Sequence, residues 1–176
     1  MAPVALRHAG RDGLRRGVWA VSEHSAGILL FRYRDTRLEV LLGHPGGPLW
    51  AHRDDGAWSI PKGLCGPDET PLAAAQREFQ EETGFTVHGK FMALGSLRQP
   101  SGKVVHAWAL EKSIDVSRVV SNTFSLEWPP HSGHIGTWPE IDRAAWFDMP
   151  SARVKITHGQ LGFLDRLTEA LRRGGR

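Results

Sequence analysis

The sequence predicts an α/β fold in which a mixed β-sheet is packed between helices. Two apolar runs near the start, residues 25–33 and 38–43, are bounded by turn residues and indicate buried strands. A central segment, residues 70–84, has helix-capping residues at both ends, and residues 150–173 repeat apolar side chains at helical spacing. Strands combined with one central and one terminal helix favour a sheet covered by helices.

The composition bounds the kind of protein. The chain has 176 residues, 40% hydrophobic and 23% charged, so one domain can bury a sizeable core. The net charge is +3, the pI is about 9.4, and arginines gather near both ends, which we interpret as solvated tails. The single cysteine excludes an internal disulfide framework, and no apolar run approaches the ~18 residues of a membrane helix. We therefore expect a cytoplasmic protein with no membrane partner.

The first segments lead from a tail into a hairpin. Residues 1–20 are rich in arginine and glycine and weakly periodic, which predicts a flexible N-terminal tail before a single domain at 21–176. The strand at 25–33 pairs with the strand at 38–43 across a short turn. The long loop from His44 to Ala57 contains glycines, prolines, a tryptophan and charged residues, which indicates a functional loop more than a spacer.

The central helix has clear boundaries. Thr70 can cap its first turn, and Pro71 suits the first helical position because that position leaves its N–H unpaired anyway. Gly84 is the expected stop. Apolar residues at helical spacing predict its buried stripe. These residues are Leu72, Ala75 and Phe79.

The remaining segments complete the sheet and add a second helix. Residues 91–97 and 104–110 alternate as two strands around a turn. Residues 121–133 are predicted to be irregular because they are rich in proline, and residues 144–148 form the last strand. A second helix is predicted over 150–173. Its apolar side comprises Ile156, Leu161, Leu164, Leu167 and Leu171.

Carboxylates gather on one face of the central helix. Glu78, Glu81 and Glu82 stand at i, i+3 and i+4, so they project from adjoining positions, and Glu69 lies in the loop just before the helix. Several carboxylates in a small volume repel one another unless a hard divalent cation lies among them. Oxygen ligands of this kind suit Mg²⁺ or Mn²⁺.

These residues belong to a longer spaced pattern. It runs through Gly63, five residues, Glu69, seven residues, Arg77-Glu78, Phe79, any residue, Glu81-Glu82, any residue, Gly84 and Phe85. The pattern resembles the signature of the Nudix hydrolases, which cleave diphosphate linkages attached to a nucleoside or similar group. The resemblance implies an α/β/α sandwich with a mixed β-sheet between helices, and it extends over residues 25–170.

The resemblance also implies roles for individual residues. Glu78 and Glu82 match metal-binding positions, and Glu81 matches a third carboxylate that binds metal or orients a metal-bound water. Arg77 matches the arginine that orients the glutamates by ion pairing, and Gly63 matches a position whose backbone carbonyl often joins the metal shell. The implied cofactor is Mg²⁺, with Mn²⁺ as an alternative.

Candidate residues also lie outside the signature. The family often has a further carboxylate shortly before a late tryptophan-containing strand. Glu140 fits best as this extra ligand or base, and Glu127 is the alternative. The segment leading to Lys62 resembles that of enzymes acting on dinucleoside polyphosphates and diphosphoinositol compounds, so Lys62 is the expected partner of a substrate phosphate. The other candidate phosphate contacts are His44, His52, Arg53 and Lys103, and the candidates for stacking on a base are Trp50, Trp128 and Trp138.

Together these features predict a Mg²⁺-dependent hydrolase. We expect it to cleave a diphosphate linkage in an NTP or a dinucleoside polyphosphate by attack of water at phosphorus. An RNA 5′-end pyrophosphohydrolase is an alternative that the basic termini permit, although no aromatic and basic stripe supports nucleic-acid binding. A catalytically silent nucleotide-binding module is a third reading, and the four retained glutamates argue against it. The expected partner is a small nucleotide, and the chain is expected to be a monomer or homodimer.

Overall fold

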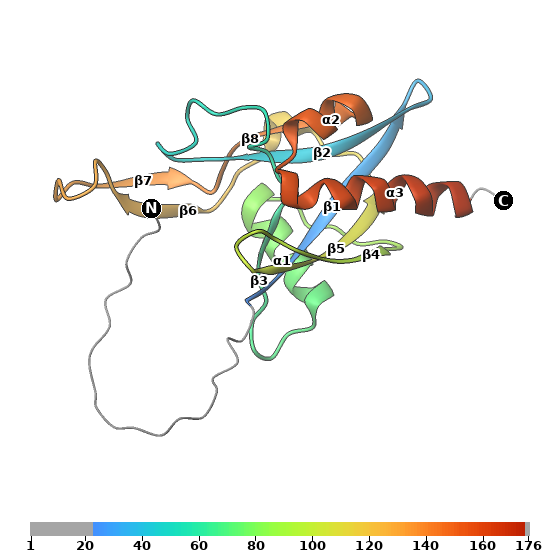
Figure 1. The fold of residues 1–176 in the computed structure, drawn as a ribbon, viewed down its shortest axis with the longest axis horizontal. Coiled ribbons are helices and arrows are strands. Elements are labelled where there is room, and N and C mark those ends of the chain that lie inside the picture. Colours follow the sequence, from blue (N-terminus) through green and yellow to red (C-terminus); the bar gives the residue numbers. More distant parts are fainter. Residues whose placement is uncertain (1–22, 175–176) are drawn as a thin grey trace.

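One mixed β-sheet forms the centre of the protein (Figure 1). The structure is a computed structural model that describes residues 23–174, so the predicted N-terminal tail lies outside the described residues. The strands of this sheet are β1 (His24–Arg34), β2 (Arg37–Pro45), β3 (Lys62–Leu64), β4 (Met92–Arg98), β5 (Val104–Glu111) and β8 (Ile141–Asp148). Their order is β4-β5-β1-β2-β8, and β3 also pairs with β1. The sheet is mixed because β1 runs parallel to β5 and antiparallel to β2 and β3.

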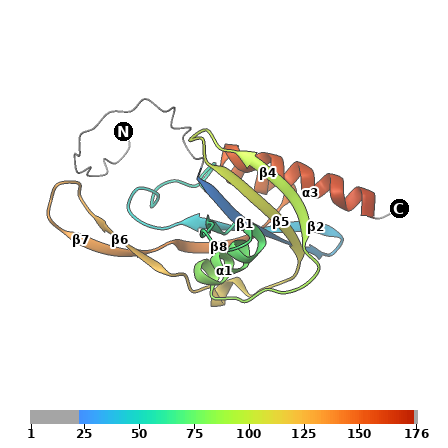
Figure 2. The same ribbon diagram turned by 90° about the horizontal axis from the view of Figure 1, so that it is seen from below.

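Helices cover both faces of this sheet (Figures 1 and 2). Helix α1 (Pro71–Thr83) packs on one face, and α2 (Met149–Lys155) and α3 (Leu161–Gly174) pack on the other. The predicted α/β/α sandwich is confirmed. No helix of the described part of the chain is long and apolar enough to cross a membrane.

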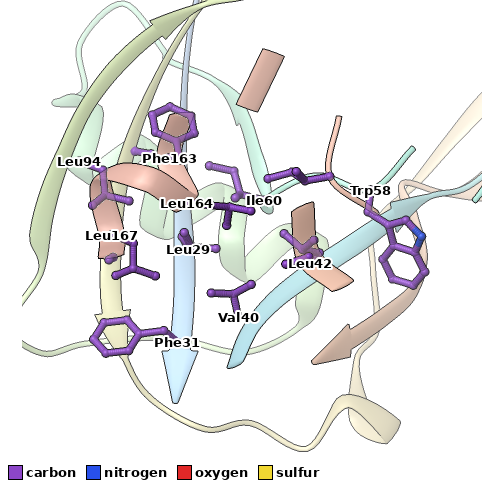
Figure 3. Packing of buried hydrophobic residues seen from close by; sticks show 14 of the residues in the cluster. Leu29, Phe31, Val40, Leu42, Trp58, Ile60, Leu94, Phe163, Leu164 and Leu167 are labelled. Carbon is purple, nitrogen blue, oxygen red and sulfur yellow. The ribbon is translucent and has the colours of Figure 1, made fainter. Parts of the chain in front are cut away.

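Alternation along β1 divides the core into two layers. Ala26, Ile28 and Leu30 pack with Phe79 of α1. The intervening Leu29 and Phe31 belong to the opposite cluster, which Figure 3 shows together with three side chains of α3. Those side chains are Phe163, Leu164 and Leu167. A strand buried on both faces explains the continuous apolar run in the sequence, since successive side chains of a strand point to opposite faces.

The boundaries of α1 follow its local sequence. Thr70 Oγ1 accepts a hydrogen bond from the Ala73 N–H at 3.3 Å, and Pro71 is the first helical residue. Gly84 ends the helix with φ of 77°, and its N–H donates to the Gln80 carbonyl. The predicted stripe is correct for Ala75 and Phe79, but Leu72 is only half-buried. Ala74 is fully buried beside Ala75, because the sheet contacts a wider face of the helix than one stripe.

The prediction of irregular structure at 121–133 was wrong. Strands β6 (Thr123–Glu127) and β7 (Ile135–Pro139) form an antiparallel hairpin that projects from the body of the protein (Figure 2). Phe124 faces Trp138 across the two strands, with ring centroids 6.3 Å apart. The two prolines that suggested irregularity lie in the connecting turn, where they remove no hydrogen bond from the ladder.

The prediction of a single helix over 150–173 was also wrong. Helix α2 ends at Lys155, and a short 3₁₀ turn, η2 (His158–Gln160), precedes α3. The break is a tertiary effect: the Trp58 N–H donates to the Lys155 carbonyl, and the Thr157 N–H donates to the Trp58 carbonyl. The chain at 155–157 therefore pairs with the segment after the long loop instead of continuing the helix. All five residues of the predicted apolar side still reach the core.

Candidate active site

Arg77 is the centre of a carboxylate network at the start of the site. Its guanidinium donates to both oxygens of Glu69, at 3.0 and 2.8 Å, and to Glu78 Oε1 at 2.7 Å and Glu81 Oε2 at 3.1 Å. It also donates to the Leu64 carbonyl at 2.9 Å. These bonds, together with the Gly66 N–H, lower the pKa of Glu69 to about 2. Arg77 thus joins the loop, β3 and the helix, and Glu69 is held as the counter-charge of the arginine.

Gly63 lies against the carboxylate of Glu78. A Cβ atom at position 63 would be only 2.0 Å from Glu78 Oε2, so no larger residue fits without displacing that side chain. Strand β3 pairs with β1 and packs along α1, which brings the Gly63 backbone and the glutamate together. The Gly63 backbone and the Glu78 carboxylate are therefore close neighbours, and oxygen ligands of these kinds are the ones that hard cations prefer.

Glu82 is the most deeply placed of these carboxylates. Its Oε2 accepts a hydrogen bond from the Lys62 N–H at 2.8 Å. The pKa of Glu82 is raised to about 8, mainly by burial; Lys62 opposes the shift, and the charges of Glu140 and Glu78 add to it. Because a buried negative charge is unfavourable without a nearby positive charge, this carboxylate should readily bind a cation or a proton.

Glu140 also reaches this group. Burial raises the pKa of Glu140, and the charges of Glu78 and Glu81 add to the shift. The Glu140 N–H donates to the Asn122 carbonyl at 2.8 Å, and the Asn122 N–H donates to the Glu81 carbonyl at 2.8 Å, so the base of the hairpin is tied to the end of α1.

Glu127 has a different environment. Its Oε1 accepts the Gly133 N–H at 2.7 Å within the projecting hairpin. Of the two outlying glutamates, the structure therefore brings Glu140 to the signature carboxylates and leaves Glu127 in the hairpin.

Carboxylate oxygens are suitable ligands for a divalent cation, but these side chains do not converge into a coordination shell. Within residues 23–174, no three His, Cys, Asp or Glu side chains converge on a common point that would hold a metal ion. The reason is visible in the contacts, because Glu78 and Glu81 turn toward Arg77 and Glu82 turns toward the Lys62 N–H. The four like-charged groups that could hold an ion are Glu78, Glu81, Glu82 and Glu140.

A cavity of about 520 Å³ opens beside this group. Lys62 lines it and interacts electrostatically with both Glu82 and Glu140, so the cavity and the carboxylates share this lysine. Lys103 is a second basic residue of the wall, paired with Glu23 at 3.3 Å. The other lining residues are Pro45, Trp50, Ala57, Ser59, Gln99, Pro100, Ser101, Val105, Thr157 and Gln160. Two cationic groups and one indole suit a ligand with phosphates and an aromatic ring.

The candidate substrate contacts from the segment 44–53 lie in different environments. Trp50 lines the cavity, and the Arg53 guanidinium lies over its ring, 5.3 Å from the centroid. His44 was wrongly expected in the loop: it is the next-to-last residue of β2 and is 0% exposed. Its ring nitrogens lie 2.7 Å from Asp142 Oδ1 and from the Arg53 carbonyl oxygen. Both ring nitrogens are therefore occupied inside the protein, where His44 holds the loop residue Arg53 next to Asp142 and cannot contact a substrate phosphate. His52 is exposed.

Sequence reasoning missed three residues of this region. Gly46 donates its N–H to the Glu140 carbonyl at 3.0 Å, Asn122 links Glu140 to α1, and Gln160 lies in the cavity wall. The Gly-Gly pair at 46–47 marked a turn in the sequence, but nothing local pointed to Asn122 or Gln160.

Trp138 packs on Phe124 in the hairpin, and the expectation that Trp50, Trp128 or Trp138 stacks on a base stays a prediction.

An α/β/α sandwich whose central helix presents glutamates beside a basic cavity defines the class of protein. A family model for the NUDIX domain matches residues 21–167, which is most of the chain. The chain therefore belongs to the Nudix family.

Curated relatives match only a segment of the chain. A 46-residue segment is 46% identical to an RNA pyrophosphohydrolase of Pseudomonas putida strain F1, covering 26% of this chain and 29% of that protein. A 54-residue match to the RNA pyrophosphohydrolase of Stenotrophomonas maltophilia strain K279a has the same identity and covers 30% of this chain and 26% of that protein. The matched segments thus span under a third of these relatives.

Solved structures match over nearly the whole chain, at low identity. A binary complex of the C. elegans Ap4A hydrolase has a TM-score of 0.58 and 20% identity, covering 86% of this chain and 98% of that one. The NUDIX domain of Shewanella oneidensis NrtR, complexed with ADP ribose, has a TM-score of 0.62 and 16% identity, covering 90% of this chain and 94% of that one. At these identities the likeness concerns the fold.

Proposed function

We propose that the protein is a hydrolase that cleaves a diphosphate linkage in a nucleoside polyphosphate, with Mg²⁺ or Mn²⁺ as cofactor. The main observation behind the proposal is the position of Lys62 between the cavity and the carboxylates. Lys62 lines the cavity and interacts electrostatically with Glu82 and Glu140. A phosphate chain bound to this lysine has its diphosphate linkage beside the carboxylates. Membership of the Nudix family supports the same reaction class.

In the proposed mechanism, the side chains of this protein position the substrate and move one proton. Lys62 binds a substrate phosphate, Trp50 and Arg53 border the nucleoside, and Arg77 keeps Glu78 and Glu81 oriented. A bound divalent ion would lower the pKa of a water molecule and neutralise phosphate oxygens, and it would be held by Glu78, Glu81, Glu82 and the Gly63 carbonyl.

Glu140 is the proposed proton acceptor. The water oxygen forms a bond to phosphorus, the bridging P–O bond breaks, and the leaving phosphate departs with the electron pair of that bond. The water proton passes to Glu140, whose pKa is raised by burial and which is not one of the carboxylates bonded to Arg77. Glu81 is the alternative acceptor, although its Oε2 already accepts a hydrogen bond from Arg77.

Two substrate classes remain as candidates within this reaction. An NTP or dinucleoside polyphosphate fits the compact cavity, and the fold-level neighbour named Ap4A hydrolase is compatible with it. An RNA 5′-end is the second candidate, because the curated relatives that match a segment of this chain are named RNA pyrophosphohydrolases.

The test is a substrate panel with purified full-length protein and Mg²⁺ or Mn²⁺. The panel contains NTPs, dinucleoside polyphosphates and 5′-triphosphorylated RNA, with reactions in ¹⁸O-water to identify the phosphorus attacked. Glu82→Gln is the matched inactive control. Turnover of a small nucleotide that depends on the metal and on Glu82 supports the proposal. Tight nucleotide binding without turnover under any condition would contradict it and leave a silent binding module.

A further inference from the structure

Gln160 has one half of its amide committed to the protein backbone. The side chain is 1% exposed, and its Oε1 accepts a hydrogen bond from the Ile60 N–H at 3.0 Å. Only the oxygen of an amide can accept that bond, so the orientation of the group is fixed. The Nε2 atom and its two N–H donors must therefore point away from Ile60.

The other half of the amide opens onto the cavity. Among residues 23–174, no hydrogen-bond partner of Gln160 Nε2 is present. The same part of the chain contains no fully enclosed side-chain nitrogen or oxygen that lacks a partner, so Nε2 cannot be sealed inside the core. Gln160 lines the 520 Å³ cavity that Lys62 shares with the carboxylates. The structure thus presents a fixed, neutral donor to whatever fills this cavity.

The chemistry of the wall indicates which part of a nucleotide meets this donor. The two cationic residues, Lys62 and Lys103, are the strong partners for phosphate oxygens. A neutral amide N–H forms a directional hydrogen bond but carries no charge, so it suits a neutral acceptor such as the carbonyl oxygen of a base. Trp50 supplies an aromatic surface in the same wall. A base with an amino group in place of the carbonyl would bring two hydrogen-bond donors together, because the amide oxygen of Gln160 already accepts the Ile60 N–H.

We propose that Gln160 is a specificity-determining residue that selects nucleotides whose base presents a carbonyl oxygen, as in 6-oxopurines and 4-oxopyrimidines, over those with an amino group there. The proposal rests on the proposed function, since it assumes that the nucleoside part of the substrate occupies the cavity. A base without the acceptor leaves a buried donor unpaired, which is a strong basis for discrimination.

The test uses three triphosphates that differ at the purine 6-position, with N1 protonated in the inosine compound alone. Inosine triphosphate carries oxygen there, the purine riboside carries hydrogen, and ATP carries an amino group. For the wild-type protein, kcat/KM for the inosine compound should exceed that for the other two by roughly tenfold, the size of one good hydrogen bond. Dissociation constants for the corresponding analogues with methylene groups at both bridging positions, measured by calorimetry, provide a readout without turnover.

Gln160→Glu separates the two halves of the amide. Glutamate keeps an acceptor for the Ile60 N–H and a similar volume, but it removes the donor from the cavity. Once the new carboxyl is ionised, the preference for inosine should disappear, and the melting temperature should fall because the variant buries a charge at a position that is 1% exposed. Gln160→Met is the second variant: it loses both bonds and should be less stable, and it should also lose the preference.

Gln99→Glu is the matched control for charge. Gln99 lines the same cavity, but its Nε2 already donates to the Gly159 carbonyl at 2.9 Å. The added negative charge should weaken all three nucleotides equally and leave their ratios unchanged. If Gln99→Glu abolishes the ratio as Gln160→Glu does, the effect is one of charge and the proposal fails.

The remaining outcomes separate this inference from the proposed hydrolysis. A wild-type protein that turns over the three nucleotides equally overturns the role of Gln160 and leaves the hydrolase intact. Analogues that bind with the inosine preference but whose parent nucleotides are not cleaved overturn the hydrolase and support Gln160. Equal weakening of inorganic triphosphate and inosine triphosphate by the uncharged Gln160→Met would place a phosphate at the amide and contradict the selection of a base.

Discussion

Replacing Glu82 by glutamine should abolish turnover and also stabilise the metal-free protein at neutral pH. Glu82 ionises at its ordinary pKa of 4.5 when the chain is unfolded, but burial raises the pKa in the folded state to about 8. Between these pH values, unfolding releases a proton, so the free energy of unfolding falls as the pH rises. Below pH 4.5 the carboxyl is protonated in both states and contributes no pH dependence.

The magnitude follows from the size of the shift. Each pKa unit corresponds to about 1.4 kcal/mol, so the destabilisation by Glu82 is on the order of 3 kcal/mol at pH 7 and 5 kcal/mol above pH 8. Glutamine keeps an oxygen that can accept the Lys62 N–H and has no charge to bury. For a chain of this length, 1 kcal/mol shifts the melting temperature by about 2–4 °C, so Glu82→Gln should melt roughly 6–12 °C above wild type at pH 7.

The assay is thermal unfolding in EDTA from pH 4.5 to 8.5, with circular dichroism as the readout. Glu127→Gln is the matched control, since this glutamate lies in the hairpin and should give no pH-dependent gain. Added Mg²⁺ should stabilise the wild type more than the variant, because the variant lacks one ligand. An equal melting-temperature difference at pH 4.5 and 8 would refute the buried-charge argument, and wild-type turnover by Glu82→Gln would refute the metal-site assignment.

Three further substitutions test the other parts of the site. Lys62→Ala should lower kcat/KM with little change in melting temperature, because it removes a phosphate contact; an unaltered kcat/KM on the best substrate would make Lys62 an ordinary surface lysine. Glu140→Gln should lower kcat by about 10²–10⁴ and change the acid limb of the pH–rate profile, whereas Glu127→Gln should change substrate preference more than kcat; a large kcat loss confined to Glu127→Gln would reverse the assignment. Gly46→Ala places a Cβ 2.0 Å from the Pro139 carbonyl and should displace Glu140, so kcat should fall with the same change in pH profile. Gly56→Ala, in the same loop with φ of 72° and open space around it, is the control and should reduce stability alone; matching pH profiles for the two glycine variants would argue against a positioning role of Gly46.

The sequence by itself determined α1 and the spacing of its carboxylates. The Thr70 cap, the Gly84 stop and the i, i+3 and i+4 carboxylates are local features, because their partners lie within a few residues along the chain. The apolar strands and the sandwich were also predictable, since a strand buried on both faces has to be covered on both. The signature residues Gly63, Arg77 and Glu78 lie together in the structure as the pattern implied.

Only the tertiary structure decided what surrounds this helix. His44 and Asp142 are 98 positions apart, and Ile60 and Gln160 are 100 positions apart, so no local pattern could pair them. The break between α2 and α3 results from pairing with Trp58, and long-range contacts of this kind override helical periodicity. The choice between Glu140 and Glu127 depends on which glutamate the hairpin ties to the end of α1. Backbone hydrogen bonds of Asn122 and Gly46 place Glu140 near the signature carboxylates, and side-chain patterns in a sequence do not encode these bonds; the role of Glu140 stays a prediction.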